Sequence, residues 1–270
     1  MENTESIKVK ESSSSNKNKS KYVLEFITEK IFMISAFVAV ISLLLIIGFV
    51  FYKGLMPFAT EGYSFIDFIF GTEWLPSSKE FGIGAMIVTS MVATVGALII
   101  GVPIGILAAI FIAEICPKKY ARVISTAVEL LAGIPSVLYG IFGLAVIVPA
   151  IQTVLSLPKG QSLLAVIIVL SIMMLPTIIS LSETSIRAVP KAYKEGSLAL
   201  GASKIETIFK VTVPAAKSGI LAGVILGIGR ALGETMAVIL VAGNSTAMPT
   251  SLLDSARPLK IGRASCRERV

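Results

Sequence analysis

Four long stretches without a charged residue dominate this sequence, at positions 31–52, 81–113, 130–158 and 160–182. Each of them exceeds the roughly 18–20 residues with which a helix crosses the hydrocarbon of a bilayer. A fifth stretch, 220–241, is apolar apart from Arg230 and Glu234. Because a backbone in lipid must satisfy its hydrogen bonds internally, continuous apolar runs of this length fold as helices. The pattern predicts an all-α, polytopic membrane protein with five spans.

Charged residues make up only 15% of the chain, against about a quarter in an average soluble domain. The net charge of +7 comes from basic residues that gather in alternate connections between the apolar stretches. Connections 114–126 and 183–217 are basic, whereas 53–80, 152–162 and 242–260 carry few lysines and arginines. Since basic loops stay on the cytoplasmic side, this alternation predicts a cytoplasmic N-terminus. The charge is therefore interpreted as a topology signal, and no nucleic-acid partner is expected.

The two ends of the chain differ from its apolar body. Residues 1–30 are rich in Ser, Asn, Lys and Glu, which cannot bury enough apolar surface to fold alone, so we expect a disordered cytoplasmic tail. The apolar run after it is too long for a cleavable signal peptide. Residues 261–270 resemble the translation of a common sequencing-library adapter, and we interpret them as an artefact. The natural protein is then expected to continue past Lys260 into a sixth span.

The sequence offers no residues for metal-dependent or covalent catalysis. It contains no histidine and only two cysteines, Cys116 and Cys266. This composition leaves no zinc site and no Cys–His or Ser–His pair. The nucleotide-binding motif Gly-x-x-x-x-Gly-Lys-Ser/Thr is also absent, so the chain is not expected to hydrolyse ATP. We predict that it is not an enzyme and that it uses no metal or cofactor.

Several predicted spans contain residues that break helices. These are Gly101, Pro103 and Gly105 in the second span, Gly133, Pro135 and Ser136 at the start of the third, and Pro176 in the fourth. A proline inside a helix removes a backbone hydrogen bond, and in lipid the freed group needs another helix or a water-lined cavity. Breaks at this depth indicate a transport path. Small residues also allow ordinary close packing of helices, and that alternative stays open.

The most informative segment is the connection 183–217. It contains Glu195, Gly196, Ser197 and Gly201, followed after nine residues by Val211, Val213 and Pro214. We expect two short amphipathic helices joined at Gly201, which can adopt a positive φ and end the first helix. Ser203-Lys-Ile-Glu206 is the pattern of a capping box that starts the second helix. Apolar residues on these helices predict a surface that docks against a partner.

The spacing of Glu195, Gly201 and Pro214 resembles the "EAA" loop of ABC-importer permeases. In that family the loop supplies a coupling helix that sits in a cleft of the cytoplasmic ATPase. Gly196 and Ser197 stand where the family usually has alanines. The resemblance therefore implies that this segment of the chain is an ATPase-coupling loop.

The second constellation is Gly229-Arg230-Ala-Leu-Gly-Glu234-Thr235. A charged side chain at the bilayer centre costs about 2.5–3.5 kcal/mol on insertion scales, so it rarely faces lipid. Arg230 and Glu234 are four positions apart, which places them on one face of a helix and allows them to pair. The planar guanidinium also suits the oxygens of an oxyanion. We predict that Arg230, Glu234 and Thr235 line a substrate path, with an internal ion pair as the structural alternative.

The same segment and two others resemble the phosphate-specific permeases of the PstC type. The other two are Glu129-Leu-Leu-Ala-Gly-Ile-Pro135-Ser136-Val-Leu-Tyr-Gly140 and Thr250-Ser-Leu-Leu-Asp254. The resemblance covers roughly residues 30–260. It implies a type I ABC-importer (MetI-like) permease fold, with five spans present of an expected six. It divides the chain into a tail, 1–30, a transmembrane permease domain, 31–260, with its coupling loop at about 183–217, and the adapter-like end.

The resemblance also implies partners and a location. The partners are a PstA-type permease, two cytoplasmic ATPase subunits and an extracytoplasmic phosphate-binding protein, all assembled in a bacterial or archaeal plasma membrane. The expected function is import of inorganic phosphate. Another oxyanion, such as molybdate, sulfate or a phosphonate, would use Arg230 equally well. A secondary transporter driven by an ion gradient would also have broken helices and intramembrane charges, but it gives no reason for the coupling-loop spacing.

Overall fold

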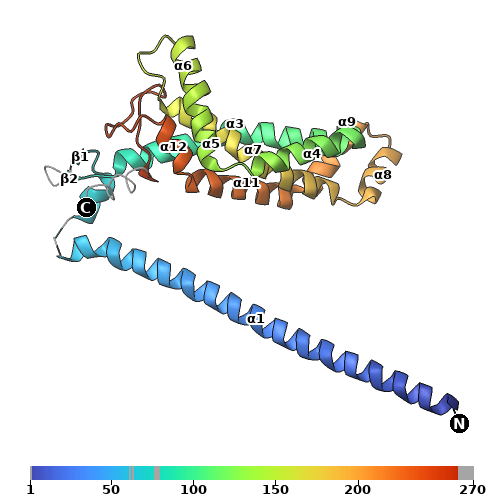
Figure 1. Ribbon diagram of the computed structural model, residues 1–270. Helices are drawn as coiled ribbons and strands as arrows, with labels where there is room; N and C mark the ends of the chain where they lie inside the picture. The colour runs from blue at the N-terminus through green and yellow to red at the C-terminus, as the bar shows by residue number, and fades with distance from the viewer. Residues whose placement is uncertain (1, 61, 63, 76–79, 261–270) are drawn as a thin grey trace. The chain divides into compact units, whose positions relative to one another are not determined.

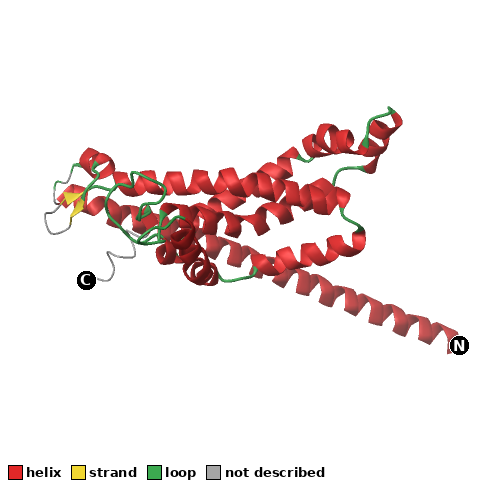
Figure 2. Ribbon diagram, turned by 90° about the horizontal axis from the view of Figure 1, so that it is seen from above, coloured by secondary structure: helices red, strands yellow, loops and turns green. Residues whose placement is uncertain are grey.

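The computed structural model describes residues 2–60, 62, 64–75 and 80–260, and the adapter-like segment 261–270 lies outside these residues. Two compact units are distinguished along the chain, an N-terminal unit, Met1–Phe65, and a C-terminal unit, Ile66–Val270. Helices make up most of both units, and two very short strands lie in the second (Figure 2). Each unit is described separately below.

The N-terminal unit consists of a single long helix, α1 (Glu2–Thr60). Its segment Leu24–Ala59 is long and apolar enough to cross a membrane, which confirms the first predicted span. The backbone of residues 2–30 is helical too, although the sequence predicts an unfolded tail there. Adding a turn to an existing helix needs no new nucleus, so a polar segment can extend a helix begun in an apolar one. Side chains before Lys21 are not described, and the disorder and cytoplasmic location of this tail stay predictions.

The described residues after Thr60 form short helices, π-helical turns and four helices of 15 residues or more (Figure 1). In chain order the elements are α2 (Phe65–Phe70), β1 (Trp74–Leu75), β2 (Glu80–Phe81), α3 (Gly84–Ile110), η2 (Phe111–Ile115), α4 (Lys118–Ala132), α5 (Ser136–Phe142), η3 (Gly143–Ile147), α6 (Val148–Val154), α7 (Leu163–Arg187), α8 (Lys191–Ala199), α9 (Lys204–Thr207), η4 (Ile208–Thr212), α10 (Val213–Ala215), α11 (Lys217–Gly233) and α12 (Met236–Val241). The strands β1 and β2 pair antiparallel, with Trp74 opposite Phe81.

The predicted spans are recovered in the described residues, with two differences. Gly84–Ile115, Ser136–Val154 and Leu163–Arg187 are long and apolar enough to cross a membrane. The third span begins at Ser136 and not at 130, because the Gly133–Pro135 segment ends α4 first. The fifth predicted span is interrupted after Gly233, and α11 also meets α10 at a bend of 69°. Four to five candidate spans are therefore present in the described part of the chain.

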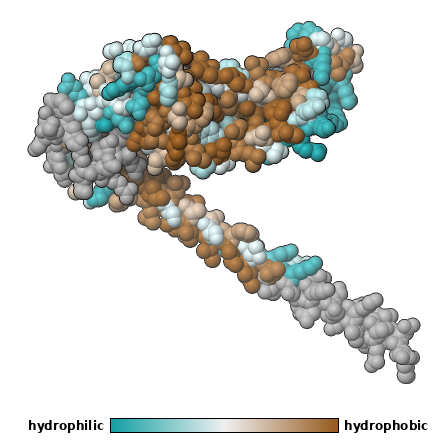
Figure 3. Space-filling view, turned by 45° about the horizontal axis from the view of Figure 1, so that its top comes forward, coloured by the Kyte–Doolittle hydropathy of each residue, from teal (hydrophilic) through white to brown (hydrophobic). Residues whose placement is uncertain are grey.

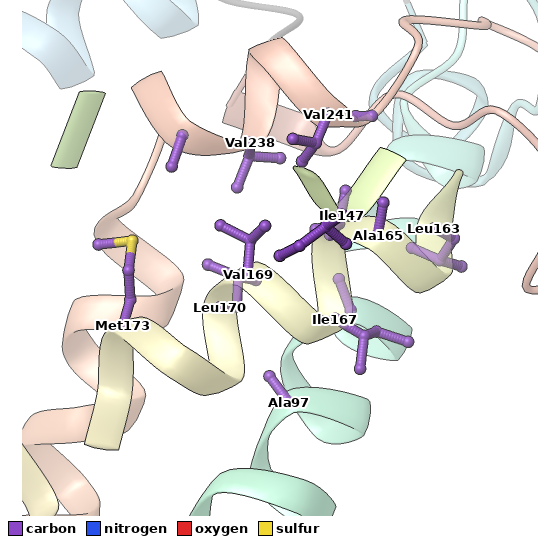
Figure 4. Close-up of a cluster of buried hydrophobic side chains, with 14 of the residues drawn as sticks. Ala97, Ile147, Leu163, Ala165, Ile167, Val169, Leu170, Met173, Val238 and Val241 are labelled. Carbon is purple, nitrogen blue, oxygen red and sulfur yellow. The ribbon is translucent and has the colours of Figure 1, made fainter. Parts of the chain in front are cut away.

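Helix α7 forms the centre of the C-terminal unit, with α3 and α11 packed against it. Its buried side chains join those of α3, η3 and α12 in one apolar cluster (Figure 4). Gly105 of α3 allows this contact, because a Cβ there would lie only 2.8 Å from Ile178 Cγ2. Gly101 packs against the backbone of Ser171 less tightly, since a Cβ there would lie 3.4 Å from Ser171 O, and α3 continues through Pro103. For this set of helix breakers the structure therefore favours the packing interpretation over a transport path.

Apolar and hydrophilic side chains are separated on the face of the C-terminal unit that Figure 3 shows. Apolar side chains cover the middle, and hydrophilic ones cover the ends (Figure 3). Helices α8 and α9 lie at one end, and α6 and α12 lie at the other (Figure 1). The basic connections 114–126 and 183–217 therefore share one end, as an alternating membrane topology requires.

The connection after α12 fastens the opposite end of α7. The backbone N–H groups of Leu163 and Leu164, which have no partner within their own helix, donate to Asp254 O at 3.0 Å and Leu252 O at 2.8 Å. Asp254 Oδ2 in turn accepts hydrogen bonds from the backbone of Thr250 and Ser251, both at 2.8 Å, and from the Thr250 hydroxyl at 2.9 Å. One carboxylate thus shapes the turn that satisfies the start of α7.

This turn predicts an acid-sensitive contribution to stability. The backbone N–H of Ser251, followed by the hydroxyl and N–H of Thr250, holds the pKa of Asp254 below its ordinary value. A lowered carboxyl pKa stabilises the fold fully above the unfolded pKa of about 3.9 and loses that effect as the pH falls through the folded pKa. We expect Asp254→Asn to lower the thermal unfolding midpoint near neutral pH, with the difference from wild type shrinking as the pH falls below about 3.9. Melting curves in detergent at several pH values would measure this, and a pH-independent difference would contradict it.

Candidate functional site

Arg230 lies in the last turn of α11, where it is half-buried and turned toward α7. Its guanidinium nitrogen Nη1 donates a hydrogen bond of 3.4 Å to Thr177 Oγ1. Thr177 follows Pro176, the proline within α7. The Thr177 hydroxyl thus orients the Arg230 guanidinium. Because that hydroxyl is neutral, it does not compensate the positive charge of Arg230. This arrangement keeps the guanidinium available for an anion.

Glu234 does not pair with Arg230, and the prediction that both lie on one face of a helix is wrong. Helix α11 ends at Gly233, and Glu234 is extended, with φ −78° and ψ 124°. Its buried carboxylate accepts a hydrogen bond of 3.0 Å from the backbone N–H of Ala237, the second residue of α12. Among the described residues no ion pair involves Arg230 or Glu234. The glycine before Glu234 weakens the helix at this point, and the carboxylate caps the next helix instead.

A small hollow lies beside Glu234 and is lined by Ser90, Ala93, Thr94, Val166, Leu170, Ala231, Glu234, Val238, Pro258 and Lys260. Its polar members include two hydroxyls of α3, Ser90 and Thr94. The Thr94 hydroxyl donates to the Ser90 carbonyl at 2.8 Å, while Ser90 Oγ accepts from the backbone N–H of Leu259 at 2.8 Å. Sequence reasoning missed both hydroxyls. Their spacing of four residues in an uncharged span is the pattern that could have indicated them.

The other predicted path residues lie at the junction between α4 and α5. Gly133 follows the end of α4, Pro135 immediately precedes α5, and Ser136 is the first residue of α5. The hydroxyl of Tyr139 donates to Leu131 O at 2.7 Å and so bridges the break. No hydrogen bond within the described residues joins this junction to Arg230 or Glu234. The contribution of Gly133, Pro135 and Ser136 to a transport path stays a prediction.

The predicted bend between two short helices is present in the connection 183–217. Helix α8 ends before Gly201, which has a φ of +87°. The N–H of Gly201 donates to Leu198 O at 3.0 Å, and the N–H of Ala202 donates to Ser197 O at 3.3 Å, the two bonds of a Schellman motif. The predicted capping box is also confirmed, because Ser203 and Glu206 bond to each other's backbone N–H.

These helices expose apolar side chains at the end of the C-terminal unit. The exposed residues are Tyr193, Leu198, Leu200, Ile205 and Phe209, and Leu200 is 91% exposed. Glu195 and Gly196 lie on the exposed part of α8, and Ser197 Oγ lies 3.0 Å from Thr207 Oγ1 of α9. We call α8, Gly201 and α9 the coupling surface. Its apolar exposure at a polar end of the molecule suits a protein partner better than lipid.

Val211, Val213 and Pro214 lie behind this surface. Val211 belongs to η4, and Val213 and Pro214 belong to α10. Pro214 lies within the continuous helical run Lys204–Ala215, and the chain bends at Ala216 rather than at the proline.

Comparisons with known proteins show which family this chain resembles. The family model described as "Binding-protein-dependent transport system inner membrane component" matches residues 101–262. The "Probable ABC transporter permease protein YqgH" of Bacillus subtilis is 44% identical over 209 residues, which cover 77% of this chain and 68% of that protein. The "Phosphate transport system permease protein PstC" of Mesorhizobium japonicum is 37% identical over 249 residues, which cover 84% of this chain and 75% of that protein.

A solved structure of the MetNI methionine ABC transporter in an inward-facing conformation also matches. It is 23% identical, with a TM-score of 0.43, and covers 56% of this chain and 68% of that chain. The family model spans both the Arg230 segment and the coupling surface. With its multiple membrane-spanning helices, this chain belongs to the binding-protein-dependent transport system inner membrane components, the permease subunits of ABC transporters.

Proposed function

We propose that this permease carries inorganic phosphate across the membrane into the cytoplasm. The observation that carries the proposal is the half-buried Arg230, held by a neutral hydroxyl in the apolar part of α11. Phosphate presents several oxygens to a guanidinium, which can bind two of them side by side. Relatives named phosphate transport system permease protein PstC support this choice of cargo. Arg230 then binds the anion, Thr177 orients Arg230, and Glu234 and Thr235 shape the path.

The coupling surface is the proposed site for a cytoplasmic ATPase. Two ATPase subunits hydrolyse ATP, and this chain contributes no catalytic residue of its own. A PstA-type permease completes the translocation path, and a phosphate-binding protein delivers the anion from outside. In this assembly the permease domain is 31–260, its coupling loop is 183–217, and the N-terminus is cytoplasmic. Exposed apolar side chains on α8 and α9 support a protein partner at this place.

Uptake by the complete complex in liposomes tests this proposal. The full-length permease is reconstituted with its partner permease, ATPase and binding protein, and labelled phosphate is supplied outside. We expect uptake that requires ATP and resists excess sulfate and molybdate. Uptake of another oxyanion in place of phosphate would overturn the cargo and leave the permease class standing. Uptake without the ATPase, driven by an ion gradient, would overturn the proposed mechanism.

A further inference from the structure

A buried polar cluster lies beneath the coupling surface, and the proposed path does not use it. Its centre is Glu183, which is 8% exposed near the end of α7. Arg187 Nε donates to Glu183 Oε1 at 2.8 Å, and Ser125 Oγ of α4 lies 2.8 Å and 2.9 Å from the two carboxylate oxygens. A serine hydroxyl has one proton, and the carboxylate is its strongest available acceptor. Burial of this carboxylate is therefore compensated from both α7 and α4.

The cluster extends to the π-helical end of α3. A π-helical turn bonds each N–H five residues back, and Cys116 N donates to Phe111 O at 2.8 Å in this way. The carbonyl of Ile112, inside that turn, accepts a hydrogen bond of 3.1 Å from Arg187 Nη2. Because the π-helical turn directs the Cys116 N–H to Phe111 O, the carbonyl of Ile112 is left for Arg187. The Arg187 guanidinium thus joins the ends of α3 and α7.

The same π-helical turn is joined to α8. Glu114 of η2 forms a largely buried ion pair with Lys194 of α8. Helix α8 has no buried residue of its own, so packing holds it weakly. Its polar attachments are this ion pair on one side and the contact between Ser197 and Thr207 on the other. The ion pair therefore links the coupling surface to a membrane-spanning helix.

We infer that the Glu114–Lys194 pair, anchored by Arg187 and Glu183, positions α8 of the coupling surface and transmits the movement of α8 to α3 and α7. This inference rests on the proposed function, because it concerns how ATP hydrolysis reaches the transport path. The structural reason is connectivity: η2 is bonded to α8 through Glu114 and to α7 through Ile112 O. When α8 moves together with its ATPase partner, the ion pair then moves the end of α3 directly. Glu114 and Lys194 are positioning residues and touch no substrate.

A charge swap across this pair tests the inference in the complete complex. Glu114→Lys and Lys194→Glu, made singly, are expected to lower the phosphate transported per ATP hydrolysed about five- to tenfold while ATP hydrolysis continues. The double swap restores an ion pair of opposite polarity and is expected to recover most of that ratio. Lys118→Glu, the same change at an exposed lysine of α4, is the matched control and should leave the ratio unchanged.

The outcomes separate this inference from the proposed function. If the wild-type complex moves no phosphate with ATP, the proposed function fails before any variant is considered. If wild type transports and the single variants keep its ratio, or the assembled double swap recovers nothing, the positioning role is overturned. Should charge reversal prevent assembly, Glu114→Gln and Lys194→Gln remove the ion pair with little change of shape. Their ratio must then fall for the inference to stand.

Discussion

Replacing Arg230 with glutamine is expected to reduce ATP-driven phosphate uptake about 10- to 150-fold. Glutamine can still hydrogen-bond to Thr177, whose hydroxyl lies 3.4 Å from the Arg230 guanidinium, but it brings no positive charge. A hydrogen bond to a charged group contributes about 1.5–3 kcal/mol, and about 1.4 kcal/mol corresponds to a factor of ten. Because Arg230 makes no ion pair among the described residues, its loss leaves no carboxylate stranded. The effect should therefore appear in transport rather than in folding.

Initial uptake rates in liposomes, together with the amount of assembled complex, provide the measurement. Arg230→Lys is the matched control, since it retains the charge and loses the planar fork. We expect its rate to lie between those of wild type and Arg230→Gln. Near wild-type uptake by the assembled glutamine variant would show that Arg230 does not bind the cargo. A complex that fails to assemble would instead assign Arg230 a structural role.

Local chemistry explains which features could be predicted from the sequence. The apolar runs identified the spans, because helices in lipid bond within themselves and need no information from distant residues. The turn at Gly201 and the capping box at Ser203 and Glu206 were predicted for the same reason, since their hydrogen bonds join residues within a few positions. Family-specific spacing then indicated that these two helices form one surface.

Features that depend on distant contacts were missed or predicted wrongly. The helix through Arg230 ends at Gly233 because Glu234 caps α12, and periodicity alone extends the helix through both. The cluster around Glu183 joins Ser125 and Ile112, which are 58 and 71 positions away in the chain. Burial of Glu183 becomes apparent only once α4 and α7 are packed together. A carboxylate at the end of an apolar run otherwise resembles an ordinary interfacial residue.

Gly201 contributes to the coupling surface through its backbone conformation and through its position in the proposed interface. The residue has a φ of +87°, which costs a residue with a side chain about 1–2 kcal/mol. A Cβ at this position would meet nothing within 4 Å, so a side chain has room in the isolated permease. The turn lies between exposed Leu198 and Leu200 on one side and α9 on the other, where the ATPase is proposed to bind. A substitution here therefore disturbs an interface more than it disturbs the fold.

Gly201→Asp is accordingly expected to leave a folded permease that no longer couples ATP hydrolysis to transport. Loss of an interface position of this kind costs about 2 kcal/mol, which corresponds to about a 30-fold fall in phosphate moved per ATP. The measurement compares uptake and ATP hydrolysis in the same liposomes, with the thermal unfolding midpoint as the check on folding.

Gly201→Asn is the matched control, because asparagine has the same shape as aspartate and also tolerates a positive φ, but it is uncharged. If asparagine couples normally and aspartate does not, charge repels the partner. If both uncouple, the interface has no room for a side chain, and if aspartate transports with a wild-type ratio, the ATPase binds elsewhere.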